Sequence, residues 1–200
     1  MTTREKIIYE SLKLFSTNGY EAVSTRMIAK AAGISDTGIY KHFKSKQEIL
    51  DTIVIICQER FKNRRMEVDI HNMCWEDVEQ VCMDMFQFQI SDEWIVMFRR
   101  LLVVEQFKNP YMAQLYQSFF IDIAVDGMTL MFDELMKLGY MKEYNPRVLS
   151  LELYAPFFLY HTLQPDSEEV LNVLREHVTY FRENYKTLKC EEVSHGLRTD

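Results

Sequence analysis

The chain has 200 residues, 48% hydrophobic and 13% aromatic with only 6 Gly and 4 Pro, which is typical of a packed helical protein and excludes a disordered or fibrous one. Residues 1–50 carry 8 Lys/Arg and 5 Asp/Glu (net +3), whereas residues 51–200 carry 15 and 25 (net −10), giving −7 in total. This asymmetry favours a small basic module that binds a polyanion. The alternative is an ordinary scatter of solvated charges, and the sequence motifs must decide between the two interpretations.

Helical periodicity dominates the chain and no alternating strand-like segment occurs, so the predicted fold class is all-α. A first helix is expected over about residues 3–17, ending at Gly19, which suits the left-handed residue after a helix. Ser24 or Thr25 should cap a second helix that runs to about Ala32.

A helix-turn-helix motif is predicted next. Gly33 breaks the second helix, and Ser35 can cap a very short third helix that ends by Phe43 or Lys44. Two helices joined by a short Gly-containing turn at a steep angle define this motif. The segment 45–48 then reads S-x-x-E, a capping box that opens a fourth helix toward Arg65.

The rest of the chain is predicted to be helical too. The expected helices cover residues 75–90, 92–107, 110–138, 145–163 and 167–188, and Pro156 should kink the fourth of these. We therefore divide the chain into a DNA-binding domain, an effector-binding and dimerisation domain and a flexible tail. The predicted boundaries are 1–46, 47–189 and 190–200.

The segment GISDTGIYKHFKSKQEIL has the features of a base-reading element. With Ile39 and Phe43 turned inward, the exposed arc carries short polar and basic side chains, which suit base edges and phosphates. Lys46 lies in the first turn of the fourth helix, where backbone N–H groups and a cation can bind a phosphate together.

These residues resemble the TetR family of bacterial transcriptional regulators, whose N-terminal signature is matched by GYEAVSTRMIAKAAGISDTGIYKHFKSKQEIL. The resemblance implies a homodimeric DNA-binding repressor, with Thr25, Tyr40 and Lys46 on phosphates. It also implies that Arg26 and the start of the third helix contact bases and that His42 touches the DNA backbone. The predicted DNA-contacting residues are Thr25, Arg26, Asp36, Thr37, Gly38, Tyr40, Lys41, His42 and Lys46.

One part of the signature departs from the family pattern. Relatives often carry a basic or neutral residue followed by Gly-Thr where this chain has Asp36-Thr37-Gly38. Asp36 could cap the helix, stay solvated or accept a hydrogen bond from a cytosine amino group.

The helix expected over residues 145–163 is apolar over more than one face and therefore needs partners on both sides, and the last helix adds apolar residues at steps of three or four. A four-helix interface between two subunits is the simplest solution, and the resemblance implies the same pair of helices; burial within one subunit is the alternative. The predicted dimer-interface residues are Tyr154, Phe157, Phe158, Leu174, Val178, Phe181 and Tyr185.

The middle helices carry many Met, Phe and Tyr side chains, which suit a pocket that repacks around an apolar effector as well as an ordinary core. The predicted pocket residues are Phe86, Trp94, Met97, Phe98, Phe107, Tyr116, Phe120, Met128, Phe132, Tyr160 and His161. By analogy with the family, effector binding should shift the fourth helix and change the separation of the two recognition helices.

Other classes of function are weakly supported. No GxSxG, HExxH, P-loop or GxGxxG motif occurs, so we predict no enzyme and no cofactor. His71, Cys74 and Cys82 are too loosely spaced for a zinc site, and we predict no metal. Reduced cysteines, a charged N-terminus and the lack of a spanning apolar run predict a cytoplasmic protein. A ligand-binding or interaction module whose helix-turn-helix only packs remains the second alternative.

Overall fold

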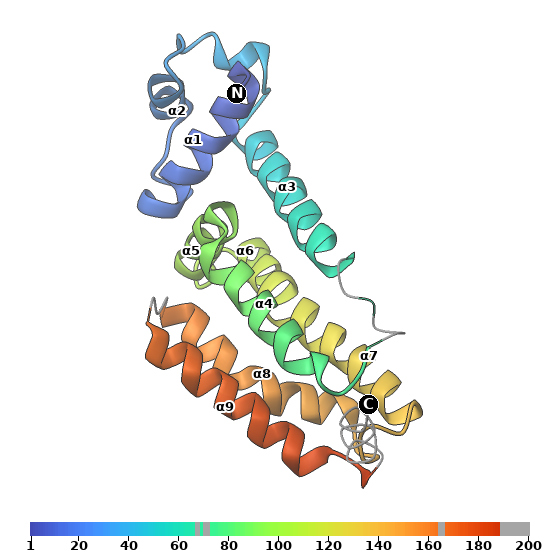
Figure 1. Ribbon diagram of the computed structural model, residues 1–200. Helices are drawn as coiled ribbons and strands as arrows, with labels where there is room; N and C mark the ends of the chain where they lie inside the picture. Colours follow the sequence, from blue (N-terminus) through green and yellow to red (C-terminus); the bar gives the residue numbers. More distant parts are fainter. Residues whose placement is uncertain (67–68, 70–72, 164–166, 189–200) are drawn as a thin grey trace. The chain divides into compact units, whose positions relative to one another are not determined.

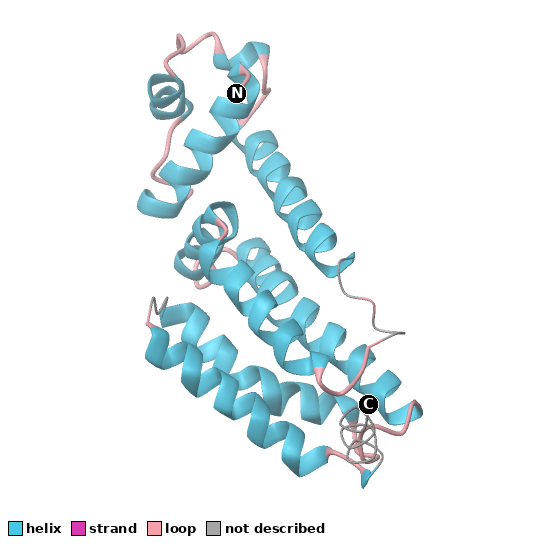
Figure 2. Cartoon of the chain, in the orientation of Figure 1, coloured by secondary structure: helices cyan, strands magenta, loops and turns pink. Residues whose placement is uncertain are grey.

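The computed structural model describes residues 1–66, 69, 73–163 and 167–188, in which helices joined by turns occur and strands do not (Figures 1 and 2). The all-α fold class is therefore confirmed. No helix in this part of the chain combines the length and the apolar character needed to cross a bilayer. The elements are α1 (Thr3–Asn18), α2 (Thr25–Ala32), η1 (Ile39–Lys41), α3 (Lys46–Met66), α4 (Asp77–Ser91), α5 (Glu93–Glu105), α6 (Pro110–Gln117), η2 (Ser118–Asp122), α7 (Ile123–Lys137), α8 (Pro146–Leu163) and α9 (Glu168–Tyr185).

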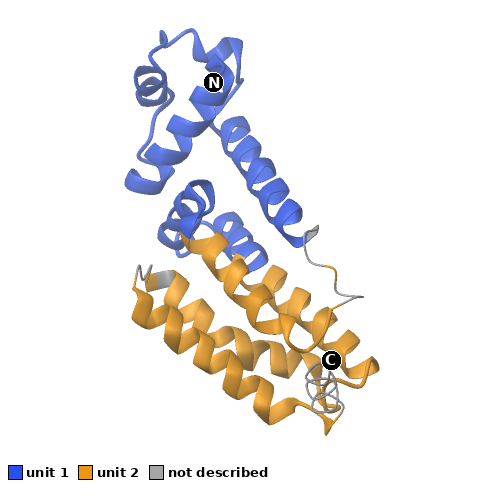
Figure 3. Cartoon of the chain, viewed as in Figure 1, with its two compact units in different colours: residues 1–65, 91–119 blue, residues 66–90, 120–200 orange. Residues whose placement is uncertain are grey.

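The chain forms two compact units (Figure 3). Unit 1 contains residues 1–65 and 91–119, and unit 2 contains residues 66–90 and 120–200. Helices α5 and α6 therefore belong with the N-terminal helices, and α5 packs against α1. The functional boundaries expected at residues 46 and 189 stay predictions, and the expected tail lies outside the described residues.

Local signals set several helix ends as expected. Gly19, Gly33 and Gly139 all have positive φ, at 81°, 72° and 78°, a region that residues with a Cβ rarely adopt. The Ser24 hydroxyl accepts the Met27 N–H and so caps α2. These bonds involve neighbours along the chain, so the sequence predicts them well.

The helix predicted over residues 110–138 is divided. It consists of α6, the π-helical segment Ser118–Asp122 and α7. The Tyr154 hydroxyl of α8 donates to the Phe120 carbonyl over 2.6 Å, so a side chain from another helix satisfies backbone in this segment. Periodicity within the segment does not reveal such a long-range bond.

The core of unit 2 corrects the predicted dimer interface. Phe132 of α7 is fully buried and stacks on Phe181 of α9, with ring centroids 5.4 Å apart. Side chains that are buried within one chain are not accessible to a second copy, so we remove them from the predicted interface. These buried residues are Tyr154, Phe157, Leu174, Val178 and Phe181. Phe158 and Tyr185 pack against the same core and are partly buried.

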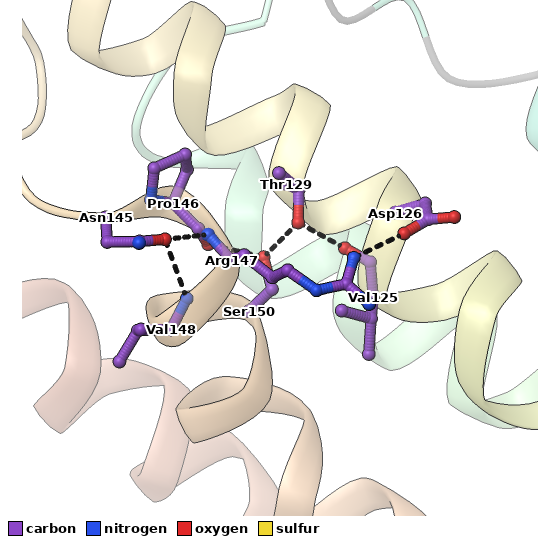
Figure 4. Close-up of polar contacts among 8 residues, drawn as sticks. All are labelled: Val125, Asp126, Thr129, Asn145, Pro146, Arg147, Val148 and Ser150. Atoms are coloured by element: carbon purple, nitrogen blue, oxygen red, sulfur yellow. Dashed lines mark hydrogen bonds and ion pairs between the residues drawn. The ribbon is translucent and has the colours of Figure 1, made fainter.

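Polar contacts join α7 to α8 at the start of α8 (Figure 4). Arg147 forms an ion pair with Asp126 at 2.8 Å, and the Thr129 and Ser150 hydroxyls lie 3.1 Å apart. The Asn145 side chain accepts the Arg147 N–H and caps α8, as predicted. Ser150 is fully buried, so its hydrogen bonds offset the cost of burying a hydroxyl.

Candidate nucleic-acid interface

Helix α2 and the turn after it hold the first part of the motif. Ile28, Ala29 and Ala32 are buried, whereas Arg26 on the opposite side is exposed. The N–H of Gly33, in the left-handed conformation, bonds back to the last turn of α2, and this ends the helix. The small buried alanines allow α2 to pack closely against α1.

The third segment is tighter than predicted. Instead of one helix from Ser35 to Phe43, a turn over residues 36–38 leads into the 3₁₀ helix η1. Both the carbonyl and the hydroxyl oxygen of Ser35 accept the Gly38 N–H, at 2.8 and 3.1 Å, and i to i+3 bonds of this kind favour 3₁₀ geometry. Ile39 and Phe43 are buried, as predicted, and they anchor the segment to unit 1.

The polar face of this segment is open to solvent. Tyr40 is 58% exposed, and its hydroxyl lies 3.5 Å from the hydroxyl of Thr25 at the start of α2. The structure thus brings together two side chains predicted to contact phosphates. Asp36, Thr37 and Lys41 are exposed as well, while Gly38 and His42 are partly buried.

Asp36 has a partner that sequence reasoning did not consider. Its carboxylate lies 3.4 Å from Nε of Arg26 on α2. Both side chains are mostly exposed, so the ion pair contributes little to stability and leaves Arg26 available to a nucleic acid. The pair accounts for a carboxylate on a face that is otherwise basic.

Lys46, in the first turn of α3, is held in place by Tyr20. Its ammonium donates to the Tyr20 carbonyl over 2.8 Å and lies over the Tyr20 ring, 4.2 Å from the centroid. The Glu48 N–H bonds to the Ser45 hydroxyl, as the predicted capping box requires, but the Glu48 carboxylate accepts the N–H of Lys44. An ammonium has three N–H donors, so the bond to the Tyr20 carbonyl does not use all of them.

Helix α5 is joined to both α1 and α3 by polar contacts. The Tyr9 hydroxyl donates to Glu93 over 2.6 Å, and this hydrogen bond raises the pKa of Tyr9. Arg60 of α3 forms an ion pair with Asp92 at 2.6 Å. At the other end of α5, Glu105 accepts the Tyr20 N–H over 3.0 Å.

Sequence reasoning missed the roles of Tyr20 and Glu105. Tyr20 lies within the quoted family signature, so the signature could have drawn attention to it. Glu105 carries no local signal, because its partner is 85 residues away in the sequence.

The predicted pocket residues are distributed over both units. Trp94, Met97, Phe98, Phe107 and Tyr116 belong to unit 1, and Phe86, Phe120, Met128, Phe132, Tyr160 and His161 belong to unit 2. The assignment of Phe107 to a pocket is wrong, because this side chain follows the end of α5 and is 86% exposed. His161 is fully buried, with its Nε2 lying 3.3 Å from the Tyr154 hydroxyl.

The zinc alternative gains no support in the part of the chain that can be described. Among those residues, no group of three or more His, Cys, Asp and Glu could hold a metal ion. The Cys74 thiol donates to Asp77, Cys82 is buried, and His71 lies outside the described residues. Burial raises the pKa of Cys82 to about 12, so this thiol stays protonated at neutral pH.

Comparison with known proteins finds relatives of the segment that contains α2, η1 and the start of α3. Residues 7–53 match the family model described as bacterial regulatory proteins, tetR family. Over 181 residues the chain is 22% identical to the Probable HTH-type transcriptional regulator YttP of Bacillus subtilis (strain 168), with 79% of this chain and 87% of that protein covered.

Two solved structures share the fold. A bacterial regulatory protein in the tetR family from Rhodococcus RHA1 aligns with a TM-score of 0.70 at 13% identity, covering 92% of this chain and 96% of the other. SmeT, the repressor of the Stenotrophomonas maltophilia multidrug efflux pump SmeDEF, aligns with a TM-score of 0.65 at 19% identity, covering 94% and 92%. At these identities the two likenesses support the fold alone.

Proposed function

Because residues 7–53 of this chain are a DNA-binding domain of the TetR family of bacterial regulatory proteins, we propose that the chain is a transcriptional repressor. It binds a palindromic operator as a homodimer, acts in the cytoplasm, where bacterial DNA lies, and is released by a small, largely apolar effector. Its task is binding, and it catalyses no reaction.

The observation that carries this proposal is the exposed polar face of the turn and η1. Buried Ile39 and Phe43 hold the segment from within, while Thr37, Tyr40 and Lys41 face solvent. Flanking groups supply phosphate contacts, because the Thr25 and Tyr40 hydroxyls lie together and the Lys46 ammonium keeps free donors. A protein that recognises a DNA duplex needs some groups that contact base edges and others that hold the phosphates, and this segment offers both kinds.

Further basic side chains extend the phosphate contacts. Arg4 of α1 lies over the Phe43 ring, with Cζ 4.7 Å from its centroid, and Lys30, Lys41 and Lys44 are exposed. If each subunit neutralises about four phosphates, two subunits release counterions from about eight. The slope of log affinity against log salt is then roughly −7.

The homodimer is proposed to form through the exposed apolar stripes of α8 and α9, which pack against each other in unit 2. Leu151 and Leu159 are exposed on α8, and Val173 and Tyr180 are exposed on α9 one heptad apart. These positions replace the buried residues named above. They leave apolar surface exposed on each chain, and a second copy can cover it.

Charges on these stripes should separate the subunits. We expect the double variant Leu159→Glu with Tyr180→Glu to be monomeric in analytical ultracentrifugation, because the carboxylates would lose hydration at the interface. The control Leu130→Glu, at an exposed position of α7, should stay dimeric. A double variant that remains dimeric would place the interface elsewhere.

The effector is proposed to bind within the apolar, Met- and Phe-rich core of unit 2. The indole N–H of Trp75 lies in this core at 2% exposure, and no hydrogen-bond partner for it occurs among the described residues. An unsatisfied buried donor is costly, so an apolar effector with one acceptor atom suits this position.

In vitro selection tests the function. The full chain should enrich an inverted repeat from a random duplex pool, with half-sites about 34 Å apart. Affinity for that duplex is then measured by fluorescence anisotropy at increasing NaCl and with a panel of apolar small molecules that carry one acceptor. Failure to enrich any sequence at low salt would contradict the repressor and favour a module whose helix-turn-helix only packs.

A further inference from the structure

Glu105, the last residue of α5, is a buried carboxylate. Only 4% of the residue is exposed, and its Oε1 accepts the Tyr20 N–H over 3.0 Å. Burying a carboxylate is costly unless hydrogen bonds compensate for its lost hydration. Its position also opposes the dipole of α1, whose negative end lies at Gly19. The stability of α1 therefore does not account for a carboxylate at this position.

Gly19 leaves the space that the carboxylate occupies. A Cβ added at Gly19 would lie 2.6 Å from the Glu105 Oε1, closer than any real contact of this kind, and the φ of 81° disfavours a side chain in any case. The end of α1 and the end of α5 are therefore fitted to each other, and the Tyr20 N–H is presented to the carboxylate.

Tyr20 extends this contact to α3. The same residue that gives its N–H to Glu105 gives its carbonyl to the Lys46 ammonium at 2.8 Å, and its ring lies beneath that ammonium. The Tyr20 hydroxyl donates to Gln47 over 3.1 Å, and burial raises the pKa of Tyr20, which keeps this donor protonated. Glu105, Tyr20 and Lys46 thus form a continuous chain of contacts.

We propose that Glu105 is a positioning residue for the phosphate contact made by Lys46, and that it acts through Tyr20. This inference rests on the proposed DNA-binding function. A lysine side chain loses considerable rotamer entropy when it is fixed on a phosphate, and Tyr20 fixes it beforehand. Without the Glu105 hydrogen bond the Tyr20 backbone is released, and the ammonium is no longer held toward the DNA.

The other polar contacts of α5 provide a matched control. Tyr9 donates to Glu93 near the opposite end of α5, so this bond also joins α1 to α5, yet it includes neither Tyr20 nor Lys46. The Tyr9–Glu93 bond is exposed and the Glu105–Tyr20 bond is buried, so a purely structural role predicts that losing the Glu105 bond costs more stability but leaves the salt slope of DNA binding unchanged. Positioning of Lys46 predicts that only the loss of the Glu105 bond weakens DNA binding.

The experiment measures the affinity of full-length variants, by fluorescence anisotropy over a range of NaCl, for the duplex enriched by the wild-type chain. We expect Glu105→Ala to bind about a hundredfold more weakly or worse, with a salt slope smaller in magnitude by about 2, because one phosphate contact is lost per subunit. Glu105→Gln should restore binding to within about threefold, since its amide oxygen still accepts the Tyr20 N–H. Tyr9→Phe should keep the wild-type affinity and slope.

A double-mutant cycle shows whether Glu105 acts through Lys46. The variant Glu105→Ala with Lys46→Ala should bind no more weakly than Lys46→Ala alone. Additive losses, or a Glu105→Ala variant with the wild-type affinity and slope, would overturn the inference while leaving the repressor intact. If the wild-type chain enriches no duplex, the proposed function itself fails. Should circular dichroism show that Glu105→Ala is unfolded, Glu105→Asp, which withdraws the carboxylate by one methylene, is interpreted in the same way.

Discussion

We expect that replacing Tyr40 by Phe and Lys46 by Glu in the same chain lowers operator affinity by about 10⁴-fold or more. In the proposed complex each subunit then loses a phosphate hydrogen bond from a hydroxyl and one from an ammonium. Hydrogen bonds to charged groups contribute about 1.5–3 kcal/mol each, so four lost in a dimer amount to at least about 6 kcal/mol. Every 1.4 kcal/mol is about tenfold in affinity, and the new carboxylates add repulsion from phosphates.

A matched variant separates this loss from a general effect of charge. Lys137→Glu with Tyr144→Phe makes the same two changes at exposed positions of unit 2 and should leave operator affinity unchanged. Tyr40→Phe alone removes only a hydroxyl that is open to solvent, so it should fold normally and still bind more weakly. If the double variant at Tyr40 and Lys46 binds as the wild type does, the exposed face of η1 does not contact DNA.

Replacing Phe132 by Ala lowers the free energy of unfolding by about 3–5 kcal/mol, which is the usual cost of removing a buried aromatic ring from a core. Phe132 is fully buried, and its ring stacks on Phe181. Phe107→Ala removes the same atoms from a side chain that is 86% exposed and should change stability by less than about 0.5 kcal/mol.

Urea unfolding, followed by circular dichroism at one protein concentration, compares the two variants. The midpoint should fall strongly for Phe132→Ala and stay in place for Phe107→Ala. A large loss of stability for Phe107→Ala would mean that this side chain is covered in solution, and its removal from the predicted pocket would have to be reversed.

The sequence by itself determined the fold class, most helix ends and the place of the DNA-binding motif. Helix ends such as those at Gly33 and Asn145 depend on bonds between residues two to four apart, and a left-handed glycine or a capping side chain makes them visible in the sequence. The alternation of buried Ile39 and Phe43 with exposed Tyr40 follows the same local logic.

Only the tertiary structure decided which apolar faces are core and how distant polar groups meet. Periodicity identifies the apolar stripe of α9 that contains Phe181, but only the packing of Phe132 against it shows that this stripe is covered within one chain and not by a second copy. The bond between Glu105 and Tyr20 joins residues 85 positions apart, so no local pattern encodes it. Local bonds are set by neighbours in the chain, whereas burial and long-range hydrogen bonds are set by the packing of whole helices.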